Sequence, residues 1–171
     1  RSDPRVATLT ILDDDVTVNF SSVNYTVIEN VPGGRAFITV DRLGGSMGAI
    51  SVQFLTSTGG TAAPYFGSGP IGNANYSNTS GTLTWASGDA ASKTFPIGII
   101  DDLATNANRT VNLVLFNATN ISTGTPILLV GRTNATLTIV DNEFGRGIIS
   151  FSARSEEHTS ELQSQSTISY A

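Results

Sequence analysis

Short stretches in which apolar and polar residues alternate recur along the chain. In residues 35–41, Ala36, Ile38 and Val40 share one face of an extended strand. Alternation with a period of two predicts half-buried β-strands, and no segment of about 12 residues has the apolar spacing of an amphipathic helix. The predicted strands are Val16–Ser22, Tyr25–Ile28, Arg35–Asp41, Ala49–Ser57, Gly81–Trp85, Ser92–Ile100, Thr110–Phe116 and Asn134–Val140.

Turn residues separate these strands, as at Pro32-Gly33-Gly34. About eight short strands between residues 16 and 140 predict an all-β fold, an antiparallel β-sandwich of about 7–8 strands. Pro96 cannot donate a backbone hydrogen bond, so its strand should be bulged or lie at a sheet edge. Residues 59–80 are rich in Gly, Pro, Ser and Asn. We expect a long loop there, either functional or a surface excursion without a function.

The chain carries an internal repeat near its two ends. Ala7–Asp13 reads ATLTILD and Ala135–Asp141 reads ATLTIVD, at an offset of 128 residues. This spacing is typical of a domain array. It predicts that residues 1–15 hold the last strand of a preceding repeat, residues 16–143 a complete repeat, and residues 144–153 the first strand of a following one. The acidic run Asp13-Asp14-Asp15 would then belong mainly to the preceding repeat.

The last 18 residues differ from the rest of the chain. Residues 154–171 read RSEEHTSELQSQSTISYA, which resembles the in-frame translation of a sequencing-library adapter. We therefore expect an artefactual tail; a natural Glu-rich helical tail is the alternative. His158, the one histidine of the chain, lies in this segment.

The composition excludes several classes of protein. There is no cysteine, which rules out disulfides, zinc–thiolate sites and a thiol nucleophile. The formal net charge of −5 leaves no basic surface for nucleic acid. No apolar run approaches the ~20 residues of a membrane helix, so membrane attachment would come only from other parts of a parent protein. Residues 1–153 contain neither His nor Cys, and the adjacent Asp101 and Asp102 should point apart rather than across a cleft. We predict that the chain is not an enzyme.

Several short motifs in a fixed order carry a resemblance to a known family. They are Tyr25–Asn30 (YTVIEN), Val40–Gly45 (VDRLGG), Gly60–Ala62 (GTA), Gly81–Trp85 (GTLTW), Lys93–Phe95 (KTF), Ile99–Asp102 (IIDD) and Ala135–Asp141 (ATLTIVD). Together they resemble a Calx-beta repeat. The resemblance implies an Ig-like sandwich, found in tandem in extracellular adhesion and matrix proteins and in the regulatory part of sodium–calcium exchangers. Some members bind Ca²⁺ at one end of the sandwich.

The resemblance also implies a set of metal ligands. The family's acidic positions fall on Glu29, Asp101, Asp102, Asp141 and Glu143. Ca²⁺ prefers several hard oxygen ligands, which such carboxylates supply.

Two departures weaken this assignment. Asn75 and Asn106 stand where the family has acidic residues, and Arg109 places a cation nearby. Ca²⁺ is the one candidate cofactor; capping of turns by Asp101, Asp102 and Asp141, with Arg109 as counter-ion, is the alternative.

Eight of the chain's 13 asparagines lie in Asn-X-Ser/Thr sequons, which predicts a glycosylated surface protein. Co-occurrence of Asn with Ser and Thr in strands and turns is the alternative. A glycan should not fit at Asn19, inside a predicted strand. The sequons are at Asn19, Asn24, Asn75, Asn78, Asn108, Asn117, Asn120 and Asn134.

Two functions remain open at this point. The first is a structural or adhesive module of a tandem-repeat, secreted or cell-surface glycoprotein. Its partners would be neighbouring repeats, or further copies joined by strand exchange into a homo-oligomer, rod or filament through residues 7–13 and 147–152. The second is a Ca²⁺-binding regulatory module in which the metal stiffens the joint between repeats.

Overall fold

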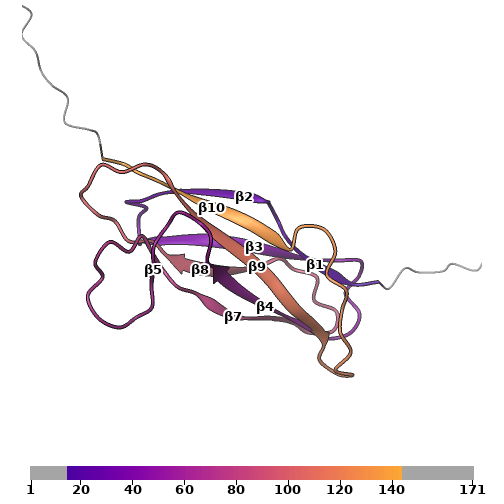
Figure 1. Ribbon diagram of the computed structural model, residues 1–171. Coiled ribbons are helices and arrows are strands. Elements are labelled where there is room, and N and C mark those ends of the chain that lie inside the picture. Colours follow the sequence, from indigo (N-terminus) through magenta and orange to yellow (C-terminus); the bar gives the residue numbers. More distant parts are fainter. Residues whose placement is uncertain (1–14, 144–171) are drawn as a thin grey trace, which may run out of the picture.

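The computed structural model describes residues 15–143, which form a sandwich of β-strands (Figure 1). This part of the chain contains no helix, and so none that is long and apolar enough to cross a membrane. The strands are β1 (Thr17–Phe20), β2 (Asn24–Ile28), β3 (Arg35–Leu43), β4 (Ile50–Ser57), β5 (Pro64–Tyr65), β6 (Tyr76–Ser77), β7 (Ser80–Trp85), β8 (Lys93–Gly98), β9 (Arg109–Asn120) and β10 (Asn134–Val140).

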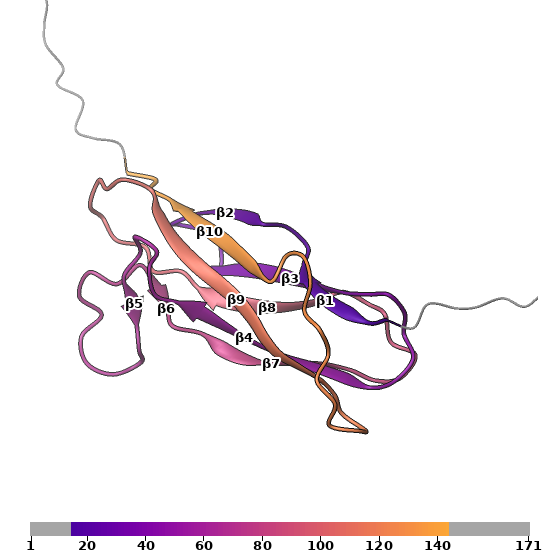
Figure 2. The same cartoon turned by 45° about the vertical axis from the view of Figure 1, so that its right-hand side comes forward.

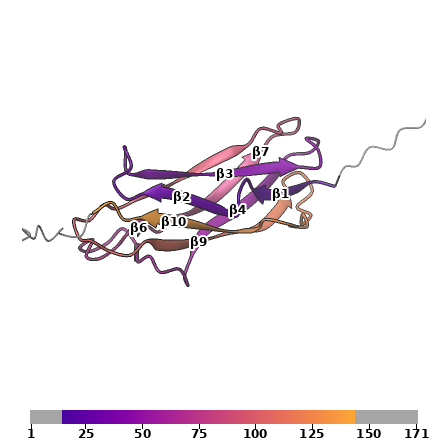
Figure 3. The ribbon, with the colours of Figure 1, turned by 90° about the horizontal axis from the view of Figure 1, so that it is seen from above.

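Two sheets pack face to face. One has the order β1-β3-β8 and the other β2-β10-β9-β4-β7, while β5 and β6 form a separate short pair. The strands run along the long axis of the molecule, so residues 15 and 143 lie at opposite ends (Figures 1 and 3). We call these ends the N-terminal pole and the C-terminal pole. The predicted all-β, Ig-like sandwich is confirmed.

One main strand pair departs from the expected antiparallel arrangement. β2 and β10 are parallel, with Ile28 beside Val140, and β5 and β6 are parallel as well. The cause is a change of sheet: β1 pairs with β3, and β2, after a short break, continues in the same direction in the opposite sheet. Since β2 and β10 both run towards the C-terminal pole, the residues that follow them emerge side by side.

The core contains the apolar face that alternation predicts. In β3, Ala36, Ile38 and Val40 are buried, and Trp85 is fully buried. Between the sheets, the rings of Phe54 and Phe95 stack with centroids 3.8 Å apart.

The expected position of the proline strand is confirmed. β8 lies at the edge of the three-stranded sheet, with Pro96 opposite Phe37 of β3.

Two strand assignments need correction. Residues 59–80, expected to be an irregular loop, contain β5 and β6 at the C-terminal pole (Figure 2). β9 continues to Asn120, beyond the predicted end at Phe116. Asn117 has φ 49° and the register against β4 shifts nearby, so Asn117 is exposed and Ala118 is buried. This irregularity breaks the alternation that marks the strand in the sequence.

One buried charge was not predicted. Arg42, near the C-terminal end of β3 and on its core face, is 5% exposed, and burial lowers the pKa of its guanidinium. The guanidinium donates hydrogen bonds to the backbone carbonyls of Gly45, Met47, Gly48, Ala86 and Asp89. Arg42 therefore ties the turn after β3 to the turn after β7.

Candidate metal centre

Three carboxylates converge at the C-terminal pole because three strands end there. Glu29 follows β2, Asp101 lies three residues after β8, and Glu143 lies three residues after β10. The Glu29 amide donates to the Val140 carbonyl at 2.9 Å, which continues the parallel pairing of β2 with β10. The Ile99 amide donates to Gly34 at 2.8 Å and brings the segment after β8 to the same place.

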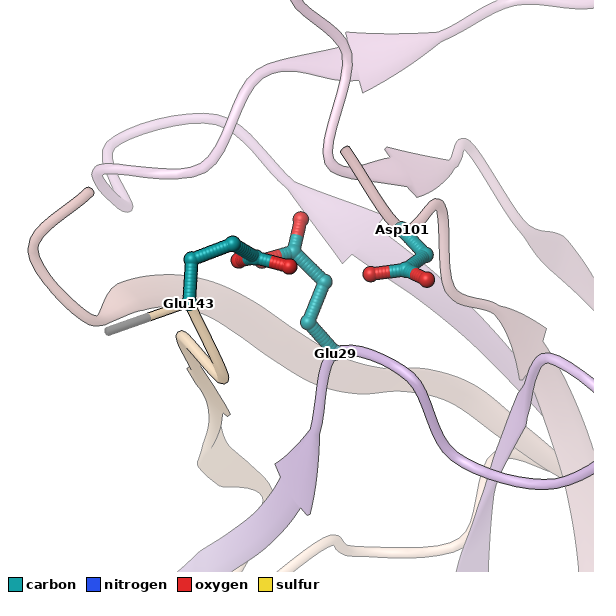
Figure 4. Close-up of side chains that lie close together, drawn as sticks. All are labelled: Glu29, Asp101 and Glu143. Atoms are coloured by element: carbon teal, nitrogen blue, oxygen red, sulfur yellow. The ribbon is translucent and has the colours of Figure 1, made fainter. Parts of the chain in front are cut away.

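The geometry of this cluster suits a calcium ion. One carboxylate oxygen from each of Glu29, Asp101 and Glu143 lies within 4.8 Å of the others (Figure 4). Oxygens bound to one Ca²⁺ at 2.3–2.6 Å are separated by at most about 4.6–5.2 Å. The three side chains range from buried Glu29 to exposed Asp101, so the site is open to solvent on one side.

The deepest carboxylate has an unused acceptor. Glu29 is 4% exposed, and no hydrogen-bond donor in residues 15–143 contacts its Oε1. The buried atoms Glu143 Oε2 and Asn142 Oδ1 also lack a donor within this part of the chain. Buried polar atoms in folded proteins almost always have a partner. An inward-facing carboxylate oxygen without one is what a cation site requires.

Electrostatics also favour a cation here. Burial raises the pKa of Glu29 above its ordinary value, and the charges of Asp102, Glu143 and Asp141 raise it further; the backbone amide of Asp102 acts in the opposite direction. Burial likewise raises the pKa of Glu143, together with the charges of Asp141 and Asp101. The carboxylates thus destabilise one another's ionised forms, and a divalent cation would reverse that effect.

Two further predicted ligands cap the loop beside the cluster. Asp102 accepts hydrogen bonds from the Ala104 amide at 2.8 Å and from the Asn106 side chain at 3.2 Å. Asp141 accepts one from the Asn106 amide at 3.0 Å. The capping alternative is therefore observed for Asp102 and Asp141, which order the loop, while the charges of both residues act on Glu29. Their role as metal ligands stays a prediction.

The two asparagines that replace acidic residues do not turn an amide oxygen to the cluster. Asn106 Oδ1 faces Arg109 Nη2 at 3.4 Å. Asn75 is buried, and its Oδ1 accepts a hydrogen bond from the Ala63 amide at 3.0 Å. Asn75 anchors the segment between β4 and β7, and this structural role was not predicted from the sequence.

Arg109 is not an ion-pair partner of these acids. The ion pair in residues 15–143 joins Lys93 to Asp89, at the N-terminal pole. Arg109 Nε is buried without a hydrogen-bond partner in the described residues. The expected counter-ion role is therefore not observed as a direct contact.

The sequons differ in accessibility. Asn19 and Asn75 are 7% and 6% exposed, and Asn19 packs against Gly131. Asn120 is half-buried, and its Oδ1 accepts hydrogen bonds from the Ser122 and Thr123 amides. The exposed sequon asparagines are Asn24, Asn78, Asn108, Asn117 and Asn134.

Two sheets of this topology, with acidic residues from three strand ends at one pole, define an Ig-like sandwich with a candidate metal centre. The Calx-beta domain family matches residues 12–143, and the chain belongs to this family. The resemblance found in the sequence is thereby confirmed.

Solved structures agree with this assignment. The chain is similar to the apo-form Calx CBD1 domain, with 26% identity and a TM-score of 0.61 over 75% of this chain and 98% of that one. It is also similar to the calcium binding domain CBD12 of CALX1.1, with 28% identity and a TM-score of 0.57 over 72% and 44% of the two chains.

A curated relative is far longer than this chain. Adhesion G-protein coupled receptor V1 of Danio rerio is 28% identical over 127 residues, which are 74% of this chain and 2% of the receptor. The chain thus corresponds to one small part of that protein.

Proposed function

We propose that this Calx-beta domain is a non-enzymatic structural module of a multi-repeat secreted or cell-surface protein, and that it binds Ca²⁺ at its C-terminal pole. The calcium assignment rests on buried Glu29, whose unpartnered Oε1 lies with Asp101 and Glu143 in one cluster. The name of the CALX1.1 relative, a calcium binding domain, supports the same choice of ion.

The placement of the chain ends supports a role in an array. Residues 15 and 143 lie at opposite poles, so domains joined end to end would extend in a line (Figure 3). The adhesion receptor relative supports a cell-surface setting. Neighbouring repeats are the proposed partners. Strand exchange into a filament stays a prediction, because residues 7–13 and 147–152 lie outside the described residues. The proposed domain boundaries also stay a prediction, and the adapter-like tail lies outside the described residues.

Titration calorimetry tests calcium binding. We expect heat on adding Ca²⁺ with a Kd of about 10⁻⁴–10⁻³ M, the range of extracellular modules, because three carboxylates make a small ligand set. Asp101→Ala should weaken binding at least about tenfold, since it removes one of these ligands. Asp41→Ala is the control: Asp41 lies on β3 and contacts Ser92 instead. No heat with the wild-type chain, or equal binding by Asp101→Ala, would contradict the proposal.

Glycosylation is tested by intact mass before and after endoglycosidase, on protein isolated from its native source. We expect a mass loss, with glycans mapped to the exposed asparagines such as Asn24 and Asn134. Asn19 and Asn75 should be unmodified because their side chains are buried. An unchanged mass would show that the sequons reflect composition alone.

A further inference from the structure

An open groove of mixed polar and apolar lining lies at the N-terminal pole, at the opposite end from the carboxylates. Its volume is about 920 Å³, and it is lined by the turn after β3, by residues 15–17 and by the segment 125–130. This last segment lies beside β1: Thr17 Oγ1 donates to the Leu128 carbonyl at 3.2 Å. Two lining side chains, Met47 and Leu128, are 79% and 78% exposed.

The chain enters the sandwich along the wall of this groove. Asp15 and Val16 line it. The Asp15 backbone lies so close to Gly44, at φ 80°, that a Cβ atom at position 44 would collide with the Asp15 carbonyl. The path of the chain is therefore fixed against the turn after β3, and whatever precedes residue 15 starts from the groove.

The C-terminal pole carries exposed apolar side chains of its own. Leu103 is 94% exposed, Phe66 69% and Ile71 53%. Leu103 lies in the loop that hydrogen-bonds to the departing chain, through the Asn106 amide and Asp141 Oδ1. An apolar tip thus lies beside the point where the chain leaves the domain.

The internal repeat places such a tip near the groove. We take residues 7–12 as the last strand of a preceding repeat, equivalent to β10 in this one. Only residues 13–16 then separate that strand from Thr17, the first residue of β1. The five residue steps from 12 to 17 span at most about 17 Å. A linker this short forces the C-terminal pole of the preceding repeat to lie at the groove.

We propose that the groove around Met47 binds the C-terminal pole of another copy of this domain, head to tail, with Leu103 inserted into it. The proposal rests on the array role proposed above. The contact is heterologous, since two different surfaces meet, so it can extend from copy to copy without closing. Each surface carries exposed apolar side chains, Met47 and Leu128 in the groove and Leu103 at the C-terminal pole, and burying these side chains removes them from water. Between separate molecules the affinity is low, and the covalent linker supplies an effective concentration near millimolar.

Nuclear magnetic resonance of the full chain tests the contact. Between about 0.05 and 2 mM, a range that brackets this effective concentration, amide signals of residues 46–50 and 101–106 should shift together. Met47→Gln and Leu103→Gln should each abolish the shifts, because a polar amide is then buried without a partner. Both positions are exposed, so the fold is preserved. Phe37→Gln, at an exposed apolar residue of β3 that lies outside both the groove and the loop of residues 101–106, should leave the shifts unchanged.

Mixing the two variants separates a head-to-tail contact from a symmetric one. Isotope-labelled Leu103→Gln retains an intact groove, and unlabelled Met47→Gln retains an intact Leu103. Adding unlabelled Met47→Gln to labelled Leu103→Gln should therefore shift the amide signals of the groove residues. Absence of concentration-dependent shifts in the wild-type chain, or failure of the mixture to restore them, would overturn the proposal. Calcium titration of the wild-type chain distinguishes the two proposals: heat of Ca²⁺ binding without concentration-dependent shifts would overturn this contact and leave the calcium site intact.

Discussion

Replacement of Arg42 by methionine should destabilise the domain by about 4 kcal/mol, because carbonyls in the two turns lose their charged donor and a hydrogen bond to a charged group contributes about 1.5–3 kcal/mol. The methionine side chain fills similar space, so the loss reports hydrogen bonding more than volume. Arg42 is buried and donates to carbonyls of both turns, including Met47 at 2.6 Å and Asp89 at 3.2 Å.

Urea unfolding followed by Trp85 fluorescence measures this effect. Arg35→Met, at an exposed position of the same strand, is the matched control and should change stability by less than about 0.5 kcal/mol. Arg42→Lys should recover only part of the loss, since an ammonium group cannot spread its donors as a guanidinium does. A loss in Arg42→Met no larger than that of the control would show that water replaces the guanidinium in these turns.

Replacement of Glu29 by glutamine should stabilise the metal-free domain and remove its response to calcium. In wild-type protein, Glu29 is a buried carboxylate facing other carboxylates. Glutamine removes that charge, and its amide can donate to Asp101 or Glu143. We expect a gain of about 1–3 kcal/mol without metal, the usual cost of an unsatisfied buried group. Wild type should gain about 2.7 kcal/mol at a Ca²⁺ concentration of 100 Kd, and the variant should gain little.

The pH dependence follows from the raised pKa of Glu29. Because the folded state holds this proton more tightly than the unfolded chain, the metal-free wild type should lose stability as pH rises from the unfolded pKa through the folded one. Glu29→Gln should flatten that loss. Thermal unfolding in chelator and in excess Ca²⁺, at several pH values, measures both effects, with Asp41→Asn as the control. A variant less stable than wild type in chelator would show that the hydrogen bond from the Asp102 amide to Glu29 outweighs the repulsion among the carboxylates.

Strand positions were predictable because each main strand buries one face. Asn19 shows the limit of that argument: alternation in β1 places it outward, yet a segment 112 residues downstream covers it with Gly131. Arg42 occupies a core position for which alternation predicts an apolar side chain. The contact of Asn19 is distant in sequence, and Arg42 bonds both to the turn that follows its own strand and to the distant turn after β7. Apolar alternation encodes neither arrangement.

Three of the five predicted acidic residues, Glu29, Asp101 and Glu143, lie in the carboxylate cluster, and their hydrogen bonding was not predictable. Family resemblance identified five acidic residues. The Asn106 side chain donates to Asp102 and the Asn106 backbone amide donates to Asp141, so these two carboxylates are already hydrogen-bonded within the loop. Glu29 comes beside Glu143 only because β2 is parallel to β10. Strand polarity within a sheet depends on the complete topology, which alternation does not encode.

The parallel pairing of β2 with β10 has a mechanical consequence. Tension between the two poles draws β2 towards the N-terminal pole, through β1, and β10 towards the C-terminal pole. The two strands are therefore pulled past each other along their length, in the shear direction, and the hydrogen bonds over the register from Thr136–Asn24 to Val140–Ile28 carry the load together. In a domain with this connectivity, the hydrogen bonds between β2 and β10 must break together under tension, rather than one after another.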